Sequence, residues 1–258
     1  MIARRPGKFS YNPVMEPAAQ TARDVDVVIP ALNERENLET LLPGLREALD
    51  ALALEARIIV VDGGSSDGTR EAAALLGATV VVQKERGYGG ALLAGFREAA
   101  APFVVTMDAD LSHRPEFLKE FWERREEADL FIASRYVAGG RAEMNWFRLL
   151  LSRILNATFA LVLSLPFKDV SSGFRMYRRG TLSKVVFQSR DFDVLEEILI
   201  RIYNQGCRIR EIPFTYTPRE SGRSHVRLFR FGLAYVKTLA RMRKLRAGGA
   251  KKGVGSRQ

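Results

Sequence analysis

Cysteine and histidine are scarce in this sequence of 258 residues. Cys207 is the single cysteine, which rules out an intramolecular disulfide and fits a reducing compartment. The two histidines, His113 and His225, offer little material for a histidine-based metal site or a serine–histidine triad. The composition therefore excludes disulfide-stabilised secreted domains and disfavours histidine-centred catalysis.

Long hydrophobic runs are also lacking. The first residues contain no apolar region of the kind found in secretory signal peptides. The longest suggestive apolar stretch without a charge is Ile154–Phe167, and its 14 residues fall short of the roughly 20 that a membrane-spanning helix needs. We therefore expect a cytoplasmic protein without a membrane-spanning segment.

Two common nucleotide-binding signatures are missing. No G-x-x-x-x-G-K-[ST] segment occurs, which argues against a P-loop nucleotidase. The turn after the first expected strand lacks G-x-G-x-x-G, which argues against a dinucleotide-dependent oxidoreductase.

Apolar strands and amphipathic helices alternate along residues 24–224, which we predict to form one α/β domain. Alternation of this length favours right-handed crossovers and a mainly parallel central sheet with helices on both faces. Residues 1–23 have little periodicity and are expected to form a flexible arm. The expected strands are Val25–Pro30, Arg57–Asp62, Thr79–Gln83, Val104–Met107, Leu130–Ser134 and Arg208–Thr215.

Two carboxylates follow the central strand directly. Asp108 and Asp110 are separated by one residue, so in an extended chain they point the same way. Acids that face together repel unless a cation lies between them, and oxygen ligands suit Mg²⁺ or Mn²⁺. Two solvated acids at the start of a loop would be the simpler interpretation if this motif stood alone.

Three other polar segments also follow expected strands: Pro30–Glu34, Asp62–Thr69 and Lys84–Gly90. The carboxyl ends of parallel strands meet at one edge of a sheet, where ligands bind in such folds. Asp62 and Asp67 lie in a glycine-rich turn, where each could bind a nucleobase or ribose or simply cap the next helix.

Two further interpretations concern these turns. Asn33 is a candidate N-cap of the helix after the first strand. Lys84–Gly90 precedes a helix N-terminus and could bind phosphate, although most glycine clusters only relieve backbone strain.

The net charge of +10 is concentrated at the end of the chain. Residues 219–258 hold 12 Lys or Arg and one acid, whereas the preceding 218 residues hold 28 basic and 29 acidic side chains. Residues 225–246 have a basic face opposite an apolar one, which predicts a helix lying in the interface of an anionic membrane. The alternative is a helix that packs on the domain with a solvated basic face. Residues 247–258 are expected to be disordered.

Seven segments occur in order between Val25 and Leu228: VVIPALNERENL, VVDGGSSDGT, KERGYGGALLAGF, DADLSH, SRY, SSGFRMYRR and IPFTYTPRESGRS. In this combination the chain resembles the family-2 glycosyltransferases with the A-type nucleotide-sugar-binding fold. Within them it is most similar to the dolichol-phosphate mannose synthases and related polyprenyl-phosphate sugar transferases. Three positions depart from the usual family pattern: Gly63, Ser112 and the tract Gly222–His225.

The resemblance, together with the positions of these residues, implies a set of roles. Asp108 and Asp110 would hold a divalent metal and, with Arg219, form the catalytic group. The acceptor phosphate would meet Arg135, Arg175, Arg219 and Ser224. The nucleotide sugar would be bound by Pro30, Ala31, Asn33, Glu34, Asp62, Lys84, Gly89, Asp108, Ala109, Asp110 and Arg135.

The implied reaction is transfer of a sugar, with GDP-mannose the favoured donor, to a polyprenyl phosphate with inversion. The expected partners are a nucleotide sugar, a polyprenyl phosphate lipid and an anionic membrane, with Mg²⁺ or Mn²⁺ as cofactor and a peripheral location on the cytoplasmic face. A UDP-sugar-dependent glucosyl or N-acetylglucosaminyl transferase is the neighbouring alternative. A nucleic-acid-binding protein that uses the basic tail is less favoured, because no aromatic stacking motif lies in a basic sheet.

Overall fold

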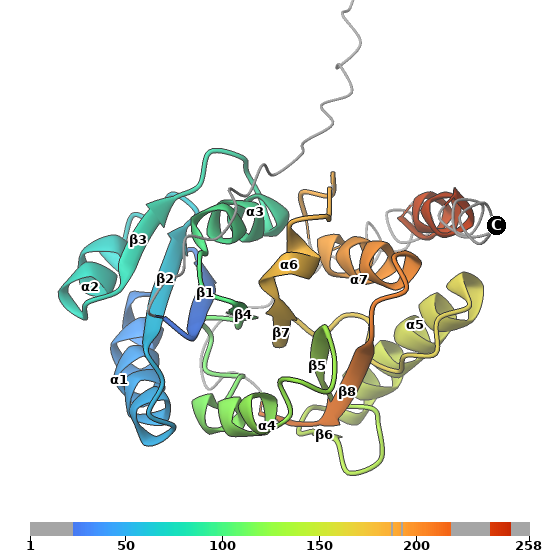
Figure 1. The fold of residues 1–258 in the computed structure, drawn as a ribbon, viewed down its shortest axis with the longest axis horizontal. Helices are drawn as coiled ribbons and strands as arrows, with labels where there is room; N and C mark the ends of the chain where they lie inside the picture. Colours follow the sequence, from blue (N-terminus) through green and yellow to red (C-terminus); the bar gives the residue numbers. More distant parts are fainter. Residues whose placement is uncertain (1–22, 187, 192, 218–237, 249–258) are drawn as a thin grey trace, which may run out of the picture.

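A seven-stranded sheet in the order β3-β2-β1-β4-β7-β5-β8 forms the centre of the molecule (Figure 1). The structure, a computed structural model, describes residues 23–186, 188–191, 193–217 and 238–248. The strands of this sheet are β1 (Val25–Ala31), β2 (Ala56–Asp62), β3 (Thr79–Val82), β4 (Phe103–Thr106), β5 (Leu130–Ser134), β7 (Arg175–Arg178) and β8 (Ile209–Pro213).

Every neighbouring pair in this sheet is parallel except those of β7, which runs antiparallel between β4 and β5. The predicted α/β class with a mainly parallel sheet is therefore confirmed. A short second sheet pairs β6 (Arg141–Ala142) with β9 (Thr215–Tyr216). The strand expected at residues 208–215 is thus divided between the two sheets.

Helices cover both faces of the large sheet (Figure 1). The helical elements are α1 (Arg35–Ala51), α2 (Thr69–Leu75), α3 (Tyr88–Glu98), the 3-10 turn η1 (Pro115–Phe117), α4 (Leu118–Glu123), α5 (Trp146–Leu163), α6 (Arg179–Leu182) and α7 (Val194–Asn204). The apolar side chains of α3 and α7 share one cluster, and those of α1 and α4 share another.

The strands join these two clusters because their side chains alternate between the faces. In β1, Val28 belongs to the α3–α7 cluster, whereas Val27 and Ile29 belong to the α1–α4 cluster. All three are fully buried. This burial on both faces explains why the strands read as continuous apolar runs.

The register of the sheet places four strand ends at one edge. Ala31 of β1 pairs with Asp62 of β2, and Asp62 pairs with Val82 of β3. On the other side of β1, Val28 pairs with Thr106, the last residue of β4. The segments that follow these strands therefore converge, as the alternation predicted.

α5 differs from the other helices because most of it is exposed. Its 18 residues have a mean hydropathy of 1.4 with 17% of them buried, so it is long and apolar enough to cross a membrane by length and composition. The expectation that no segment reaches that length was wrong, because the uncharged run is part of a longer apolar helix that also contains Arg148 and Arg153. The same composition also suits a helix that lies on a surface.

Several predictions for the chain ends fall on residues outside those described: the arm at residues 1–22, the first half of the tail helix at 225–237, and residues 249–258. Residues 238–248 are helical. Met242 is fully buried, and Leu239 and Leu245 pack against the α3–α7 cluster. For this half of the tail the alternative holds: its apolar side faces the protein rather than a membrane.

Candidate active site

The loop after β4 places Asp108 and Asp110 at the edge where the strand ends converge. The backbone N–H of Asp108 donates to His113 Nδ1 at 2.9 Å. The backbone N–H of Ser112 donates to Asp110 Oδ1 at 3.1 Å, and the Ser112 hydroxyl binds the same oxygen. The two acids are therefore held by the loop itself, and the Asp108 side chain is 31% exposed.

These two carboxylates fit a Mg²⁺ or Mn²⁺ ion better than a metal that needs an all-protein cage. Within the described part of the chain, no group of three or more His, Cys, Asp or Glu residues could hold a metal. Mg²⁺ usually takes one or two carboxylates and completes its shell with water and substrate phosphates. The donor set at Asp108 and Asp110 matches that pattern.

His113 and Tyr88 flank Asp108. The His113 ring stacks on Phe174 with centroids 4.8 Å apart, and its Nε2 lies 3.7 Å from Asp108 Oδ2. Burial lowers the pKa of His113, against the opposing charges of Asp108 and Asp110. Burial and the charge of Asp108 raise the pKa of Tyr88 well above its usual value. Both side chains therefore stay neutral in this geometry near pH 7.

The turns after β1 and β2 bind each other. The backbone N–H of Asn33 donates to Ser65 Oγ, and the backbone N–H of Ser66 donates to Asn33 Oδ1, both at 2.9 Å. Asn33 was predicted to cap α1, but α1 begins at Arg35 after Glu34, and the Asn33 amide is used between the two turns instead. Asn33 adopts a positive φ of 55°, which asparagine tolerates better than most residues.

The two aspartates of the second turn are used by the turns themselves. Asp62 is fully buried and accepts hydrogen bonds from the N–H groups of Gly64 and Ser65. Asp67 accepts from the N–H groups of Arg35 and Thr69. The predicted contact of Asp62 with a nucleotide is thus corrected to a structural role, and Asp67 acts as the turn acid of the alternative interpretation.

The third turn offers two exposed cations. Lys84 and Arg86 are both exposed beyond the end of β3. Gly89 is buried, its N–H donates to Arg190 O at 2.7 Å, and a Cβ there would lie 2.3 Å from Ser189 O. Close packing against residues 189–190 uses the Gly89 amide, so a contact of Gly89 with the nucleotide sugar, which stays a prediction, could not use that N–H.

Arg135 follows β5, and its guanidinium binds a buried acid. Its Nε and Nη2 donate to the two carboxylate oxygens of Asp169, each at 2.7 Å, and Nη2 also donates to Ser171 Oγ. Burial alone would lower the pKa of Arg135, but the hydrogen bonds and charge of Asp169 raise it above its usual value. The phosphate contacts predicted for Arg135 would have to share this guanidinium with Asp169.

Arg175 is corrected outright. Its side chain is fully buried in β7 and donates to three backbone carbonyls, those of Val170, Ser172 and Leu195. An acceptor phosphate cannot reach it, because the sheet and α7 enclose the guanidinium. Arg219 and Ser224, the other two predicted phosphate contacts, lie outside the described residues.

The remaining predicted contacts lie at the edge itself. Pro30 and Ala31 end β1, with Ala31 buried and Pro30 partly exposed. The backbone N–H of Glu34 donates to Thr69 Oγ1 at 3.0 Å, which joins the first turn to the start of α2. Ala109 lies between Asp108 and Asp110 and is buried in the α1–α4 cluster.

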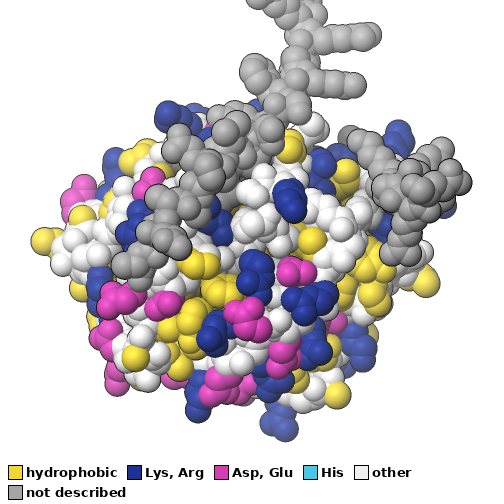
Figure 2. Space-filling view, viewed as in Figure 1, with side chains coloured by type: hydrophobic (Ala, Val, Ile, Leu, Met, Phe, Trp, Pro, Cys, Tyr) yellow, Lys and Arg dark blue, Asp and Glu magenta, His cyan; other side chains and the backbone are white. Residues whose placement is uncertain are grey.

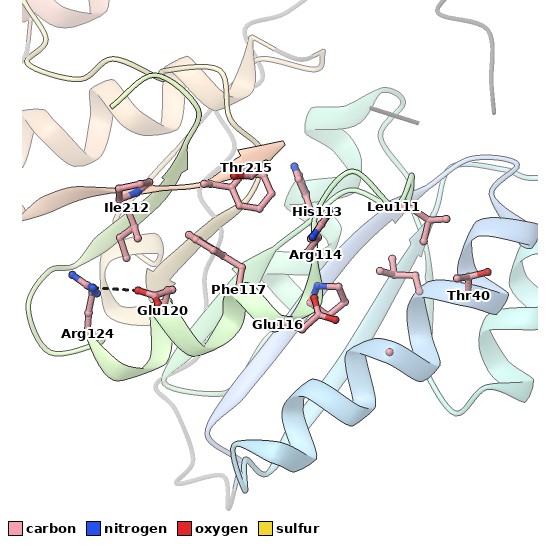
Figure 3. A pocket seen from close by; sticks show the side chains of 15 residues that line it. Thr40, Leu111, His113, Arg114, Glu116, Phe117, Glu120, Arg124, Ile212 and Thr215 are labelled. Carbon is pink, nitrogen blue, oxygen red and sulfur yellow. Dashed lines mark hydrogen bonds and ion pairs between the residues drawn. The ribbon is translucent and has the colours of Figure 1, made fainter. Parts of the chain in front are cut away.

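Two pockets border this region. The larger, about 940 Å³, lies between α1 and the η1–α4 segment, and Figure 3 shows Thr40 on one wall and Glu116 and Phe117 on another. Leu111 and His113 of the loop after β4 line this pocket, whereas Asp108 and Asp110 do not. This pocket therefore borders the loop after β4 without reaching the two carboxylates.

The second pocket, about 650 Å³, lies along α5. Arg153 and Lys168 are its charged lining residues, and Tyr136 joins them. The Tyr136 hydroxyl and Ser152 Oγ lie 2.7 Å apart, and the Tyr136 ring lies 5.8 Å from the Arg153 guanidinium. The remaining lining is small or apolar: Ala157, Ala160, Leu161, Ser164, Leu165 and Phe167.

Sequence reasoning missed Tyr88, Tyr136 and Asp169. Tyr88 lies within the segment KERGYGG and Tyr136 within SRY, so both belong to segments that the sequence analysis named. The neighbouring residues in the sequence gave no indication of their partners. Nothing in the sequence indicated the partner of Asp169. Its pairing with Arg135 joins residues 34 positions apart.

The sheet order, the acids at its carboxyl edge and the paired turns define an A-type glycosyltransferase fold. The chain belongs to glycosyl transferase family 2, whose model matches residues 26–186.

Two curated relatives are similar along most of the chain. A dolichol-phosphate mannosyltransferase of Pyrococcus furiosus is 38% identical over 213 residues, which cover 79% of this chain and 59% of the relative. A polyprenol monophosphomannose synthase of Mycolicibacterium smegmatis is 35% identical over 214 residues, covering 76% and 78%. The match thus spans less than two thirds of the length of the Pyrococcus furiosus relative.

Solved structures show the same fold. Glucosyl-3-phosphoglycerate synthase of Mycobacterium tuberculosis, in complex with Mn²⁺, uridine diphosphate and phosphoglyceric acid, superposes with a TM-score of 0.69 at 23% identity, covering 93% of this chain and 84% of that chain. The same enzyme in complex with Mg²⁺ and uridine diphosphate gives a TM-score of 0.67 at 21% identity, covering 95% and 86%.

Proposed function

We propose that this chain transfers a sugar, with GDP-mannose the favoured donor, to the phosphate of a polyprenyl phosphate at a membrane surface, with inversion at the sugar. The two curated relatives, named for mannose and for dolichol phosphate or polyprenol monophosphate, support the sugar and the acceptor. Asp108 and Asp110 at the carboxyl edge support a Mg²⁺- or Mn²⁺-assisted site.

The exposed face of α5 is the observation that favours a lipid acceptor over a soluble one. Asn156, Phe159 and Leu163 are buried against the domain, so this side of α5 is fixed. At 100° per residue the opposite side carries exposed apolar residues. They are Trp146 (72% exposed), Phe147 (55%), Leu150 (49%), Ile154 (53%) and Leu161 (81%).

An apolar helix docked along one side is suited to lie in a membrane interface rather than to cross it. In Figure 2 hydrophobic side chains gather at the right of the molecule, where α5 lies in Figure 1. Arg148 and Arg153 are exposed on the same helix, and cations near an anionic surface contribute about 1 kcal/mol each. This supports a peripheral location on a membrane surface, and the assignment to its cytoplasmic face stays a prediction.

The pocket along α5 suits the acceptor phosphate and its first isoprene units. Arg153 and Lys168 supply positive charge, and the apolar lining supplies a wall for the chain. Arginine binds phosphate through two parallel hydrogen bonds. Arg153 is thus the proposed contact of the acceptor phosphate in place of Arg175. Contacts of Arg219 and Ser224 with the acceptor phosphate remain predictions.

The nucleophile needs no strong general base. A phosphomonoester has a second pKa near 6, so it is largely anionic at neutral pH. Asp108 and Asp110 would hold the divalent ion, which when bound would offset the charge that develops on the departing nucleoside diphosphate. Asn33, Glu34 and the turns tied to them would line the nucleotide side of the site.

The test incubates the full chain with liposomes that contain a polyprenyl phosphate, Mn²⁺ and one nucleotide sugar at a time: GDP-mannose, UDP-glucose or UDP-N-acetylglucosamine. Mass spectrometry of the extracted lipid should show a mannosyl phosphate product from GDP-mannose. 3-Phosphoglycerate is the soluble control acceptor. Product on 3-phosphoglycerate with none on the lipid would overturn the lipid assignment, and a larger yield from a UDP-sugar would overturn the donor.

A further inference from the structure

Three segments far apart in the sequence meet at Asp108. The Tyr88 hydroxyl, from the first residue of α3, donates to Asp108 Oδ1 at 3.0 Å. Gly173, in the turn before β7, lies against both residues. A Cβ at Gly173 would be 2.8 Å from the Tyr88 hydroxyl and 3.3 Å from Asp108 Oδ1. Only a residue without a side chain leaves this pair undisturbed.

The position of Gly173 is itself fixed. The Thr106 hydroxyl, at the end of β4, donates to Gly173 O at 2.7 Å. Thr106 also pairs with Arg175 in the antiparallel register of β4 and β7. The turn that carries Gly173 is therefore held against β4, the strand that leads directly into the loop with Asp108.

The backbone and the side chain of Asp108 are held by different partners. Its N–H donates to His113 Nδ1, which places the proton of a neutral His113 on Nε2, near Asp108 Oδ2. Tyr88 binds the other oxygen. Both the backbone and the carboxylate of Asp108 are therefore held by neighbouring side chains.

We propose that Tyr88 is a positioning residue for the metal site: its hydroxyl, kept in place by Gly173, orients Asp108 so that Oδ2 is presented to the divalent ion. The proposal rests on the metal role of Asp108 proposed above. Partners of metal-binding carboxylates typically change metal affinity by about 10- to 100-fold when removed.

The experiment measures Mn²⁺ binding rather than sugar transfer. Free Mn²⁺ is followed by electron paramagnetic resonance in titrations of the full chain, with and without GDP. Tyr88→Phe removes the hydroxyl and keeps the ring, and its Mn²⁺ dissociation constant should rise roughly 10-fold. Tyr203→Phe is the matched control, because the Tyr203 ring packs against Phe167 and takes no part in the proposed metal site. It should bind Mn²⁺ like the unaltered chain.

Gly173→Ala provides the second variant. Its Cβ should separate Tyr88 from Asp108 and weaken Mn²⁺ binding by a similar factor. In a Tyr88→Phe background the same change should have a smaller effect, because the close contact with the hydroxyl is gone. Additive losses would overturn the shared role of the two residues.

The dependence of turnover on Mn²⁺ concentration separates positioning from general structural damage. Raising Mn²⁺ should restore most of the turnover of Tyr88→Phe, whereas damage to the fold would not respond to metal. An unchanged Mn²⁺ dissociation constant in a folded Tyr88→Phe protein would overturn the proposal. Because Mn²⁺ binding needs no acceptor, failure of transfer to polyprenyl phosphate would count against the proposed function and leave this measurement intact.

Discussion

Single residues in this molecule divide into those that face the site and those that hold it. Asp108 and Asp110 lie at the open edge, whereas Asp62 and Arg175 are buried and bind backbone groups around them. A buried charge that lost such partners would destabilise the fold. Mutations in the first group should therefore lower activity, whereas mutations in the second group should lower stability.

Asp110→Asn tests the first group. Replacing one carboxylate oxygen by an amide should lower sugar transfer roughly 100-fold, because the metal would lose a charged ligand. The melting temperature should change little. EDTA should abolish transfer by the unaltered chain and added Mg²⁺ or Mn²⁺ should restore it. Full activity of the folded variant at saturating metal would contradict the assignment.

Glu196 gives a pH prediction for stability. Its Oε2 is buried without a hydrogen-bond partner among the described residues, and burial raises its pKa from 4.5 to about 7. The folded state then holds a proton that the unfolded state has lost, so the free energy of unfolding falls as pH rises from about 4.5 to 7. Below that window the contribution is fully present.

Glu196→Gln keeps the neutral shape and removes this titration. Urea unfolding at pH 5 and pH 8 should show a smaller loss of stability with pH in the variant, by an amount on the order of 2 kcal/mol. Equal losses in both proteins would mean that Glu196 is ionised in the folded state at pH 5.

At the scale of elements, α5 is the feature on which the proposed membrane contact rests. One side is docked through Asn156, whose Oδ1 accepts from Val170 N at 2.9 Å. The opposite side leaves five large apolar residues exposed. Scattered exposed apolar residues need no explanation, but a continuous row on one helix does.

Leu150→Gln combined with Ile154→Gln should weaken liposome binding, because each buried leucine or isoleucine contributes about 1.5–3 kcal/mol. Co-sedimentation with anionic liposomes at low and high salt measures this loss. Leu75→Gln on α2 is the control, since Leu75 is 88% exposed on a helix outside the proposed surface. If both proteins sediment alike, α5 does not bind membranes.

At the scale of the whole molecule, the end of the chain completes the core. Met242 joins the cluster that contains Phe159 of α5 and Ile198 of α7. Arg241 pairs with Asp193 at the start of α7, and Arg246 donates to Asn204 Oδ1 at its end. The segment at residues 238–248 therefore fastens along α7 and leaves its other basic residues exposed.

Met242→Ala should cost about 2–4 kcal/mol of unfolding free energy by opening a cavity in this cluster. Liposome binding should be unchanged as long as the protein is folded. Arg243→Ala, at an exposed position of the same helix, should leave stability unchanged. A Met242→Ala protein of normal stability that no longer binds liposomes would restore the interfacial role predicted for this half of the tail.

The fold class and the position of the paired acids could be predicted from the sequence alone. Both depend on local patterns: apolar runs alternate with amphipathic stretches, and Asp108 and Asp110 follow a strand directly. Parallel strands then bring their carboxyl ends to one edge whatever their exact neighbours. The antiparallel insertion of β7 between β4 and β5 left that edge unchanged.

Which polar residues are free to meet a ligand depends on contacts between distant segments, and these could not be predicted from the sequence. Tyr88 meets Asp108 across 20 positions, Arg135 meets Asp169 across 34, and Thr106 meets Gly173 across 67. An arginine that binds phosphate and one that binds a buried acid look alike in a sequence, because the residue type fixes the charge but the packing of distant segments fixes its partner.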